Sequence, residues 1–524
     1  MIDYINKLKN NNLSKEYSDI LGLGNIGIEK EALRVEELQI SLKSHPRSLG
    51  SALCNPYITT DFSEAQPELI TPPFSNEKKT LSFLEDIHHY FFYNNKEEIL
   101  WPFSMPPLVN GKKIPIAYYG SSNLGLFKHI YRKGLSHRYG KLMQIISGVH
   151  FNYSLPNEIW ENGLIAEDDK GKLENSNIIF GRSKRYFGML RNVLRMNWVI
   201  LYLFGASPIL TKDFITSRKE SFKRLDDSTF FLPYATSLRM SDYGYQNLSR
   251  VKYTISTNSL NEYVSDLVYA TETTNAEYAS ICDDHSDSRA QISPNILQIE
   301  AEYYAIARAK SNMISNDRFA YKLSNGGVDF IELRSLDLNP FSRIGIDRET
   351  TLFLEVFLIY SFFKLSEPIS NSEQQVIFKN DIDVAKYGRR EDLKLNRDGK
   401  QIKLKDWAHE ILDEMLPIAE ILDSRNLNQY TKTIKLMKSR VQNPAETLSG
   451  VLLDKVTNNK QSFTELGNSI GESNKAYFLN KTKKENPHWE LLERESNNSF
   501  NRQKVLEEDK TSFEDYKRSY FASD

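Results

Sequence analysis

The sequence predicts an α+β protein with an antiparallel or mixed sheet. Strand-like alternation is concentrated in the first two thirds of the 524 residues, and helical periodicity dominates the last third. Neither an internal repeat nor a clear linker interrupts the chain. We therefore expect one domain over residues 1–524, with a sheet region at about 20–345, a mainly helical region at about 346–483 and a charged tail at 484–524.

The first strand carries two acids. Residues 3–20 predict a helix, and residues 22–27 then match G-x-G-x-x-G. A dinucleotide site would need this motif to follow a strand and open a helix, so we interpret it as a helix-to-strand turn. The strand over 27–35 places Glu29 and Glu31 on one face. Paired carboxylates are tolerated in water, against basic partners or around a metal, and we favour Mg²⁺.

The next acids occur between residues 58 and 72. Pro67 argues against a helix here, so we expect Glu68 on a strand that ends at Pro72, with Asp61 nearby. Ser75 is a suitable N-cap for a helix that reaches about Asn94.

Residues 101–152 look irregular, and a strand follows them. In residues 147–155, Val149, Phe151 and Tyr153 alternate with His150 and Asn152, which predicts one apolar and one polar face. We expect helices over about 185–204 and over 260–281.

A further strand is predicted over residues 326–337, with Glu332 and Arg334 on one face. Asp347 is a suitable cap for the helix that follows. The remaining chain is largely helical, and residues 484–524 look like a surface helix or a loosely held tail.

Composition excludes several classes of protein. Lys plus Arg number 67 and Asp plus Glu 69, so no net charge draws the chain to nucleic acid or anionic membrane. Two cysteines exclude a disulfide framework and a zinc site, and they suit a reducing compartment. The start lacks the apolar core of a signal peptide, and the apolar runs 198–210 and 352–365 do not fit a membrane span. We expect a soluble cytoplasmic protein without membrane or nucleic-acid partners.

Hard-metal ligands thus recur on the polar faces of separate strand-like stretches: Glu29 and Glu31, Glu68 with Asp61 nearby, His150, and Glu332. Such ligands hold Mg²⁺ along a triphosphate, and Arg334 could stabilise a transferring phosphoryl group. No Walker A motif is present, so an ATP site would not be a P-loop.

Each feature also has a purely structural explanation. The Glu-x-Glu strand could be exposed to solvent, and the histidine could be hydrogen-bonded within the fold. Glu332 and Arg334 could form a surface ion pair worth about 0–1 kcal/mol. Taken alone, the residues predict no more than a metal-dependent phosphoryl-transfer enzyme.

The chain resembles the proteobacterial γ-glutamate–cysteine ligase family over about residues 15–365. The resemblance lies in ten short sequence motifs that occur in the same order as in the family. They are GIEKEALRV at 27–35, ITTDFSEA at 58–65, ELITP at 68–72, WPFSMP at 101–106, YG at 139–140, ISGVHFNYSLP at 146–156, LFGASP at 203–208, LPYATSLRMSD at 232–242, LQIE at 297–300 and IELRSLDLNPFS at 331–342.

The resemblance implies a glutamine-synthetase-like fold, in which a curved, mainly antiparallel sheet forms a funnel surrounded by helices. It implies the first step of glutathione biosynthesis: ATP- and Mg²⁺-dependent joining of the L-glutamate γ-carboxylate to the L-cysteine amine. Mn²⁺ is an alternative metal. The route would pass through γ-glutamyl phosphate and give γ-glutamylcysteine, ADP and phosphate. We expect a monomer.

The resemblance also implies roles for single residues. The metal ligands would be Glu29, Glu31, Asp61, Glu68, His150 and Glu332. Glu332 and Arg334 would be catalytic, Asn152 would contribute to binding ATP with its metal, and Arg239 would bind the glutamate α-carboxylate. The cysteine pocket would comprise Phe62, Tyr131, Tyr245 and Tyr304.

Two words depart from the family pattern. Residues 292–295 read Ile-Ser-Pro-Asn instead of Ile-Asn-Ser-Asn, and residues 304–310 replace Tyr-Ala-Pro-Ile-Arg-Pro-Lys by Tyr-Ala-Ile-Ala-Arg-Ala-Lys. Both changes touch the stretch that holds Tyr304. A relative that uses another amine in place of cysteine therefore stays open. The sequence argues against a catalytically silent amino-acid or nucleotide sensor, because every candidate ligand is present. No ATP-grasp region follows, so we do not expect the bifunctional enzyme that also adds glycine.

Overall fold

The structure is a computed structural model that describes residues 19–109, 111, 113–161, 178–215, 222–244, 253–285, 289–313, 318–424, 428–458 and 462–522. Most of the helix predicted over residues 3–20 lies outside these ranges, although residues 19–21 are helical. The predicted helix-to-strand turn is confirmed, because a turn at residues 22–23 leads directly into the first strand.

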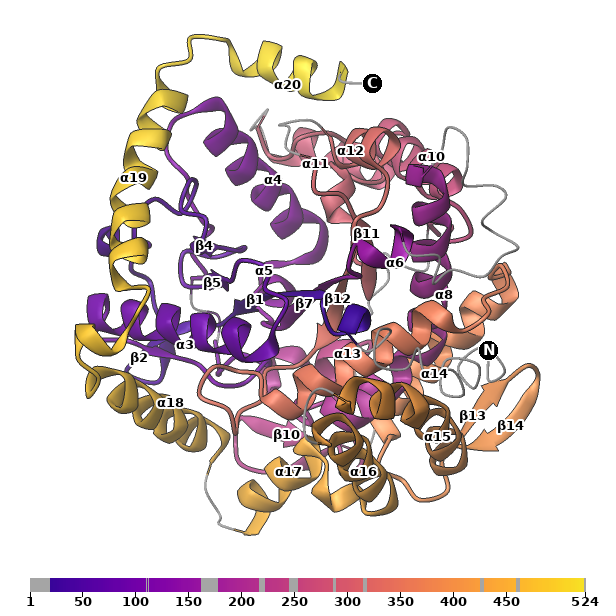
Figure 1. Ribbon diagram of the computed structural model, residues 1–524. Helices are drawn as coiled ribbons and strands as arrows, with labels where there is room; N and C mark the ends of the chain where they lie inside the picture. The colour runs from indigo at the N-terminus through magenta and orange to yellow at the C-terminus, as the bar shows by residue number, and fades with distance from the viewer. Residues whose placement is uncertain are drawn as a thin grey trace.

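A sheet of six strands lies at the centre of the described chain (Figure 1). Its order is β11 (Ala307–Lys310), β12 (Phe330–Leu336), β7 (Val149–Ser154), β1 (Asn25–Glu31), β5 (Pro67–Ile70) and β4 (Ile58–Thr60). Every neighbouring pair is antiparallel. The predicted α+β class is therefore confirmed, and its sheet is antiparallel.

The single strand predicted over residues 27–35 is wrong, because β1 ends at Glu31. The chain then enters a second sheet through β2 (Arg34–Glu36), which pairs with β3 (Gln39–Ile40) and β6 (Ile99–Leu100). Arg34 is buried there, and its Nη1 donates to Glu98 Oε2 at 2.6 Å. The chain therefore leaves the central sheet after Glu31, and the Arg34–Glu98 ion pair and the strand pairing of β2 hold it in the second sheet.

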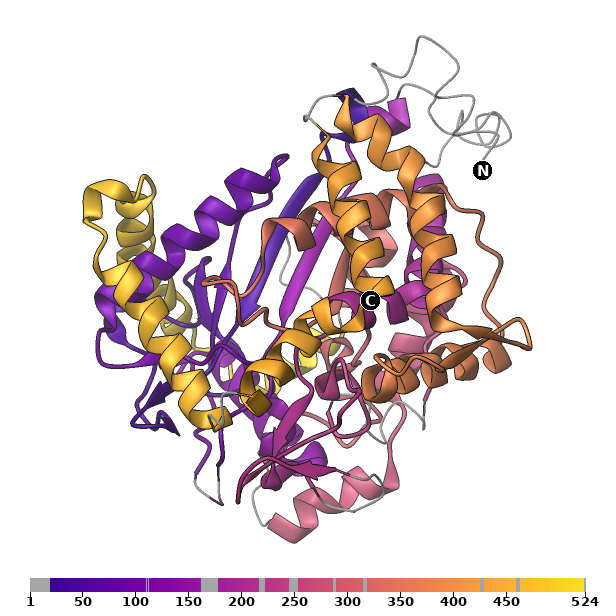
Figure 2. The ribbon, with the colours of Figure 1, turned by 90° about the horizontal axis from the view of Figure 1, so that it is seen from below.

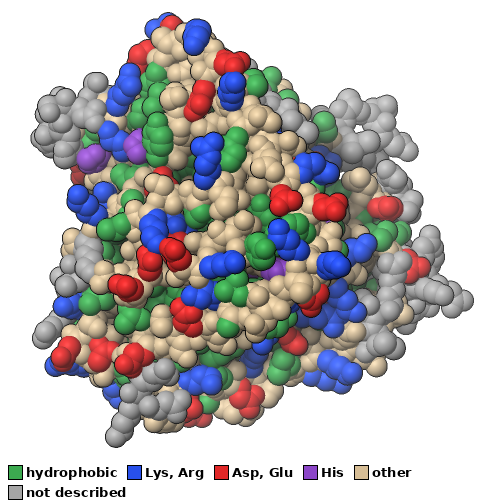
Figure 3. Space-filling model, turned by 90° about the vertical axis from the view of Figure 1, so that its left-hand side faces the viewer, with side chains coloured by type: hydrophobic (Ala, Val, Ile, Leu, Met, Phe, Trp, Pro, Cys, Tyr) green, Lys and Arg blue, Asp and Glu red, His purple; other side chains and the backbone are tan. Residues whose placement is uncertain are grey.

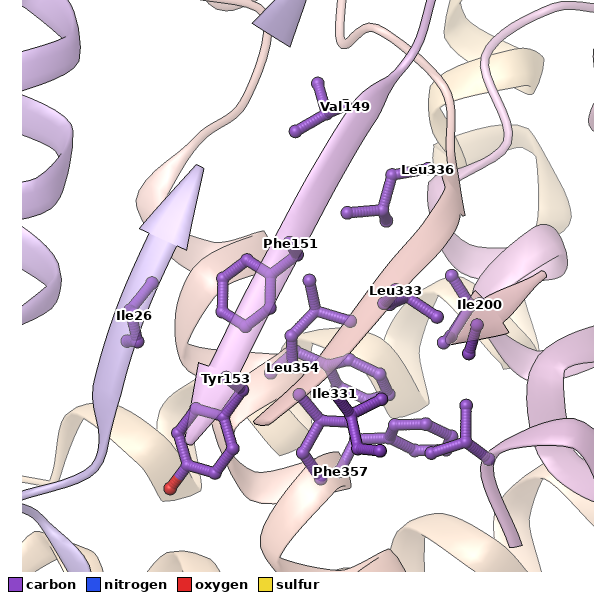
Figure 4. Close-up of a cluster of buried hydrophobic side chains, with 14 of the residues drawn as sticks. Ile26, Val149, Phe151, Tyr153, Ile200, Ile331, Leu333, Leu336, Leu354 and Phe357 are labelled. Atoms are coloured by element: carbon purple, nitrogen blue, oxygen red, sulfur yellow. The ribbon is translucent and has the colours of Figure 1, made fainter. Parts of the chain in front are cut away.

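One face of the central sheet is apolar. Phe151, Tyr153, Ile331 and Leu333 have no exposed surface. Figure 4 shows them packed among side chains of α8 (Ile178–Phe204) and α13 (Arg348–Phe363). Each such side chain gains about 1.5–3 kcal/mol from burial, so this face fixes which side of every strand turns inward. The opposite, polar face is left for the functional residues.

Three helix predictions need correction. The cap of α3 (Glu77–Asn94) is Asn76 rather than Ser75, since the Asn76 side chain accepts from the next backbone N–H groups. The region 101–152 is not irregular throughout, because α4 (Asn123–Tyr139) occupies part of it. The helix predicted over 260–281 is two helices, α10 (Leu260–Glu272) and α11 (Ala276–His285).

The last third is mainly helical, as predicted, and Asp347 caps α13. Its helices are α14 (Asn371–Tyr387), α15 (Leu404–Asp423), α16 (Gln429–Gln442), α17 (Leu448–Asn458), α18 (Phe463–Leu479), α19 (Trp489–Glu507) and α20 (Phe513–Ala522). One hairpin there, β13 (Lys394–Arg397) with β14 (Lys400–Lys403), was not predicted from the sequence. The remaining described α-helices and strands are α5 (Lys141–Gln144), α6 (Glu158–Glu161), α12 (Phe319–Gly326), β8 (Ile209–Thr211), β9 (Lys223–Arg224) and β10 (Thr229–Phe231).

The end of the chain is packed rather than loosely held. Helix α19 lies along one side of the molecule beside α3 and α4 (Figures 1 and 2). Trp489 at its start is buried against the Tyr90 ring, at 5.0 Å between centroids. On this side, acidic and basic side chains are interspersed (Figure 3). Among the described helices, none has the length and apolar character needed to cross a bilayer.

Candidate active site

The strand register brings the predicted acids onto one face of the central sheet. Glu29 of β1 stands opposite His150 of β7, and Glu31 stands opposite Glu68 of β5. Glu332 of β12 stands opposite Asn152, which shares the polar face of β7 with His150. Because side chains alternate along each strand, these residues all project from the polar side.

The side chains of these residues approach one another closely. One ligand atom each from Glu29, Glu68 and His150 lies within 4.8 Å of the others. His150 Nδ1 is 3.2 Å from Glu29 Oε2 and 3.6 Å from Glu332 Oε1. Residues that are far apart in the sequence therefore meet in one cluster, with spacing that suits a divalent cation.

Two further predicted ligands border this cluster. Glu31 is buried, its Oε1 lies 3.5 Å from His150 Nε2, and its Oε2 accepts from the Gly148 backbone N–H at 3.0 Å. Asp61 is more exposed, and its Oδ1 lies 4.0 Å from Arg132 Nη2. Asp61 therefore stands at the rim of the cluster, whereas Glu31 belongs to its floor.

Charge is distributed unevenly over the polar face. Burial raises the pKa of Glu68 well above its usual range, and repulsion from Glu29 and Asp61 adds to the effect. Burial likewise raises the pKa of Glu31, with a contribution from Asp61. Both carboxylates thus lack enough positive charge around them, which is the environment that a bound cation would relieve.

The other end of the face is well supplied with cations. Glu332 Oε1 accepts from Arg334 Nη1 at 2.9 Å, and its Oε2 lies 3.2 Å from Lys310 Nζ. Burial opposes ionisation, but Lys310 and Arg334 outweigh it and hold the Glu332 pKa well below its usual range. Burial also opposes ionisation of Glu29, whose pKa is nevertheless lowered because His150 donates a hydrogen bond to it.

Arg239 lies beside this basic end. It sits on a short 3₁₀ helix, η3 (Leu238–Met240), and is almost fully buried. Its Nη2 donates to the Arg334 backbone carbonyl at 2.9 Å, and its Nη1 lies 3.8 Å from Asp337 Oδ1. A Cβ at Gly148 would come within 2.2 Å of Nη2, so only glycine leaves room for the guanidinium.

A hollow opens at this place, partly to solvent. Its lining includes His150, Arg239, Tyr304 and Arg334. A guanidinium at its wall offers paired donors to a carboxylate, and Arg334 offers a second cation nearby. The hollow is therefore suited to a small anionic substrate.

The predicted aromatic residues separate into two groups. Tyr304 lines the hollow, and its hydroxyl donates to Gln144 Oε1. Phe62 is fully buried in an adjacent apolar cluster, against which Tyr131 packs. Tyr245 lies outside the described residues. The structure thus places one of the four predicted cysteine-pocket residues at the hollow and two in the packing beside it.

Asn152 is at the centre of the polar face, where its Nδ2 donates to Glu29 Oε1 at 2.9 Å. Lys310 and Arg308, both on β11, were not predicted as site residues from the sequence; Arg308 stands opposite Glu332. The signal was available, because Ala307-Arg308-Ala309-Lys310 alternates small and basic residues as a strand does.

Comparison with known proteins places the chain among named relatives. A family profile described as glutamate-cysteine ligase matches residues 6–384. The curated glutamate–cysteine ligase of Alcanivorax borkumensis is 38% identical over 504 residues, which cover 94% of this chain and 95% of the relative. That of Aliivibrio salmonicida is 41% identical over 434 residues and covers 82% of each chain.

A solved structure agrees with this assignment. The glutamate–cysteine ligase of Francisella tularensis, determined in complex with AMP, superposes with a TM-score of 0.88. It is 34% identical, and the match covers 95% of this chain and 98% of the relative. The clustered acids, the antiparallel sheet and these matches together show that the chain belongs to the glutamate–cysteine ligase family.

Proposed function

We propose that this protein joins the γ-carboxylate of L-glutamate to the amine of L-cysteine at the expense of ATP, the first step of glutathione biosynthesis. A γ-carboxylate oxygen attacks the terminal phosphorus of ATP, and the bond to ADP breaks. The cysteine amine then attacks the carbonyl carbon of γ-glutamyl phosphate. Phosphate leaves, the amine loses a proton, and γ-glutamylcysteine is released.

The observation that carries this proposal is the division of the sheet face into an acidic and a basic end. A ligase that uses ATP must hold a metal–triphosphate and also stabilise charge on the transferred phosphoryl group. The acidic end, with Glu29, Glu31 and Glu68, suits the metal. The basic end, with Lys310 and Arg334, suits the phosphoryl oxygens.

Magnesium fits the donor set of the acidic end. The raised pKa values of Glu31 and Glu68 mark a deficit of positive charge, and carboxylate oxygens are the ligands that Mg²⁺ prefers. Glu29, Glu68 and His150 would hold the ion, with Glu31 beside them, and Mn²⁺ would suit the same donors. When bound, the metal would supply positive charge to the phosphates of ATP.

Arg239 is suited to bind the α-carboxylate of glutamate. Its guanidinium borders the hollow next to Arg334, whose backbone carbonyl holds it in place. A glutamate anchored there would turn its side chain toward the sheet. Tyr304, which lines the same hollow, would contact the second amino acid.

Isotope transfer tests the reaction directly. With ¹⁸O in the γ-carboxylate of glutamate, an acyl phosphate route moves one ¹⁸O atom into the released phosphate. Phosphate release should require glutamate, cysteine and Mg²⁺ together. Phosphate without ¹⁸O would contradict the intermediate. Faster turnover with 2-aminobutyrate or another small amino acid than with cysteine would change the acceptor, and tight ligand binding without ADP formation would indicate a sensor.

The substitution Glu29→Gln tests the site. Removing this carboxylate should lower turnover by at least about 10²-fold, the usual cost of one electrostatic contact in a transition state. The control is Glu36→Gln, a partly exposed acid of the next strand in the chain, β2, that pairs with Lys43 on the surface. Near-normal turnover of the Glu29 variant would contradict the assignment.

A further inference from the structure

A second hollow lies on the opposite side of strand β1 from the candidate active site. Its polar lining groups are Lys30, Ser342, Arg343 and Asn474, and the rest of the lining consists of apolar side chains and Gly345. Among the described residues that line the hollow, none is acidic. A hollow with this lining offers hydrogen-bond donors and positive charge, and it excludes cations.

Lys30 is the deepest charge in this hollow. It lies between Glu29 and Glu31, so alternation along the strand turns its side chain to the opposite face. Only 4% of its surface is exposed. Gly345, in a left-handed conformation, crosses so close that a Cβ there would lie 3.1 Å from Lys30 Cε. The lysine stem is therefore tightly enclosed.

The contacts of Lys30 leave its charge uncompensated. Its Nζ is 3.1 Å from His88 Nε2, and His88 Nδ1 is 2.7 Å from the Leu84 carbonyl oxygen. A carbonyl only accepts, so Nδ1 carries the imidazole proton and Nε2 accepts from Lys30. Within the described ranges, no carboxylate forms an ion pair with Lys30. Burial lowers the pKa of Lys30 to about 7, so below that pH the amine is an ammonium, and two of its three protons are not used by His88.

We propose that this hollow binds a small monovalent inorganic anion, with chloride as the physiological example, between Lys30 and Arg343. A buried charge needs a partner, and a partly apolar lining strengthens the attraction to one. The enclosed part of the hollow accommodates a particle about the size of a water molecule, which suits a halide.

Arg343 forms the outer rim of the hollow. Its guanidinium lies 4.1 Å above the Tyr477 ring, which fixes its position. Glu85, an acid in this neighbourhood, accepts from Tyr477 and Lys481, and it also attracts Arg343 without forming a direct ion pair with it. The rim therefore supplies a second cation to an anion that enters. The inference does not depend on the proposed ligase reaction, because it concerns the other face of the sheet.

Thermal unfolding of the full chain tests the proposal. Sodium chloride is exchanged for sodium isethionate, a bulky sulfonate, at constant ionic strength. Chloride should raise the wild-type Tm saturably by at least about 2 °C, because an anion that binds only the folded state stabilises it. Lys30→Met, of similar length but uncharged, should show no chloride response. Lys483→Met, on the surface beside Trp489, should respond like the wild type.

Anomalous scattering gives an independent measurement. Wild-type crystals grown in sodium bromide should show a bromide peak in contact with Lys30 Nζ. This measurement decides the question even if the Lys30 variant does not fold. Electron density for a water molecule beside Lys30, without an anomalous peak, would overturn the proposal. So would a chloride response of equal size in wild type and Lys30→Met.

Discussion

The buried carboxyl of Glu355 allows a quantitative prediction. Glu355 lies on α13, one of the helices that cover the apolar face of the central sheet (Figure 4). Its Oε2 accepts a hydrogen bond from the Tyr430 hydroxyl at 2.7 Å. Burial raises its pKa to about 8 from the ordinary 4.5. The folded state therefore holds a proton that the unfolded state loses above pH 4.5. Stability is fully retained below pH 4.5 and falls as the pH rises toward 8.

The substitution Glu355→Gln removes this penalty, because glutamine stays neutral and its carbonyl oxygen still accepts from Tyr430. With 1.36 kcal/mol per pKa unit, the variant should gain up to about 1 kcal/mol at pH 5.5 and up to about 4 kcal/mol at pH 7.5. Urea unfolding of both proteins across this range measures the difference. A constant offset between the two proteins, or a less stable variant at pH 7.5, would refute the reasoning.

Three more variants test the site and the fold. Glu332→Gln should abolish turnover while the circular dichroism spectrum stays unchanged, because the Glu332 carboxylate pairs with Lys310 and Arg334. Retained turnover would contradict the catalytic role of Glu332. Asp337→Asn should raise KM for glutamate about tenfold and leave KM for ATP unchanged, because Asp337 supports Arg239; an equal rise in both would indicate general damage. Gly467→Ala should lower the free energy of unfolding by about 1–3 kcal/mol, as its Cβ would lie 2.2 Å from the Trp101 ring; an unchanged value in urea would contradict that close packing.

The strands of the site were predictable because their signal is local. Alternation alone places Phe151 and Tyr153 on the apolar face of β7 and His150 on the polar face. Adjacency of the strands was not predictable from the residues, since sequence does not state which strands pair. The family resemblance supplied that step, by assigning distant residues such as Glu68 and Glu332 to one site.

The missed elements depend on contacts between distant residues. Helix α4 contains Gly125 and Gly134, which lower helix propensity. A Cβ at Gly134 would come within 2.0 Å of Gln298 Oε1, so close packing explains the glycine. The packing of the C-terminal segment likewise depends on the contact of Trp489 with α3. These residues are hundreds of positions apart in the sequence.

Strand β1 shows why the site and the fold enforce each other. It carries charges on both faces, with Glu29 and Glu31 on the polar face and Lys30 on the opposite one, and the burial of Lys30 and Glu31 is costly. A slip of one residue against β7 would put Lys30 among the site cations and both glutamates into the apolar core. In the shifted register both glutamates would lose their contact with His150, because His150 projects from the polar face. The same alternation that assembles the candidate metal site therefore excludes the competing register.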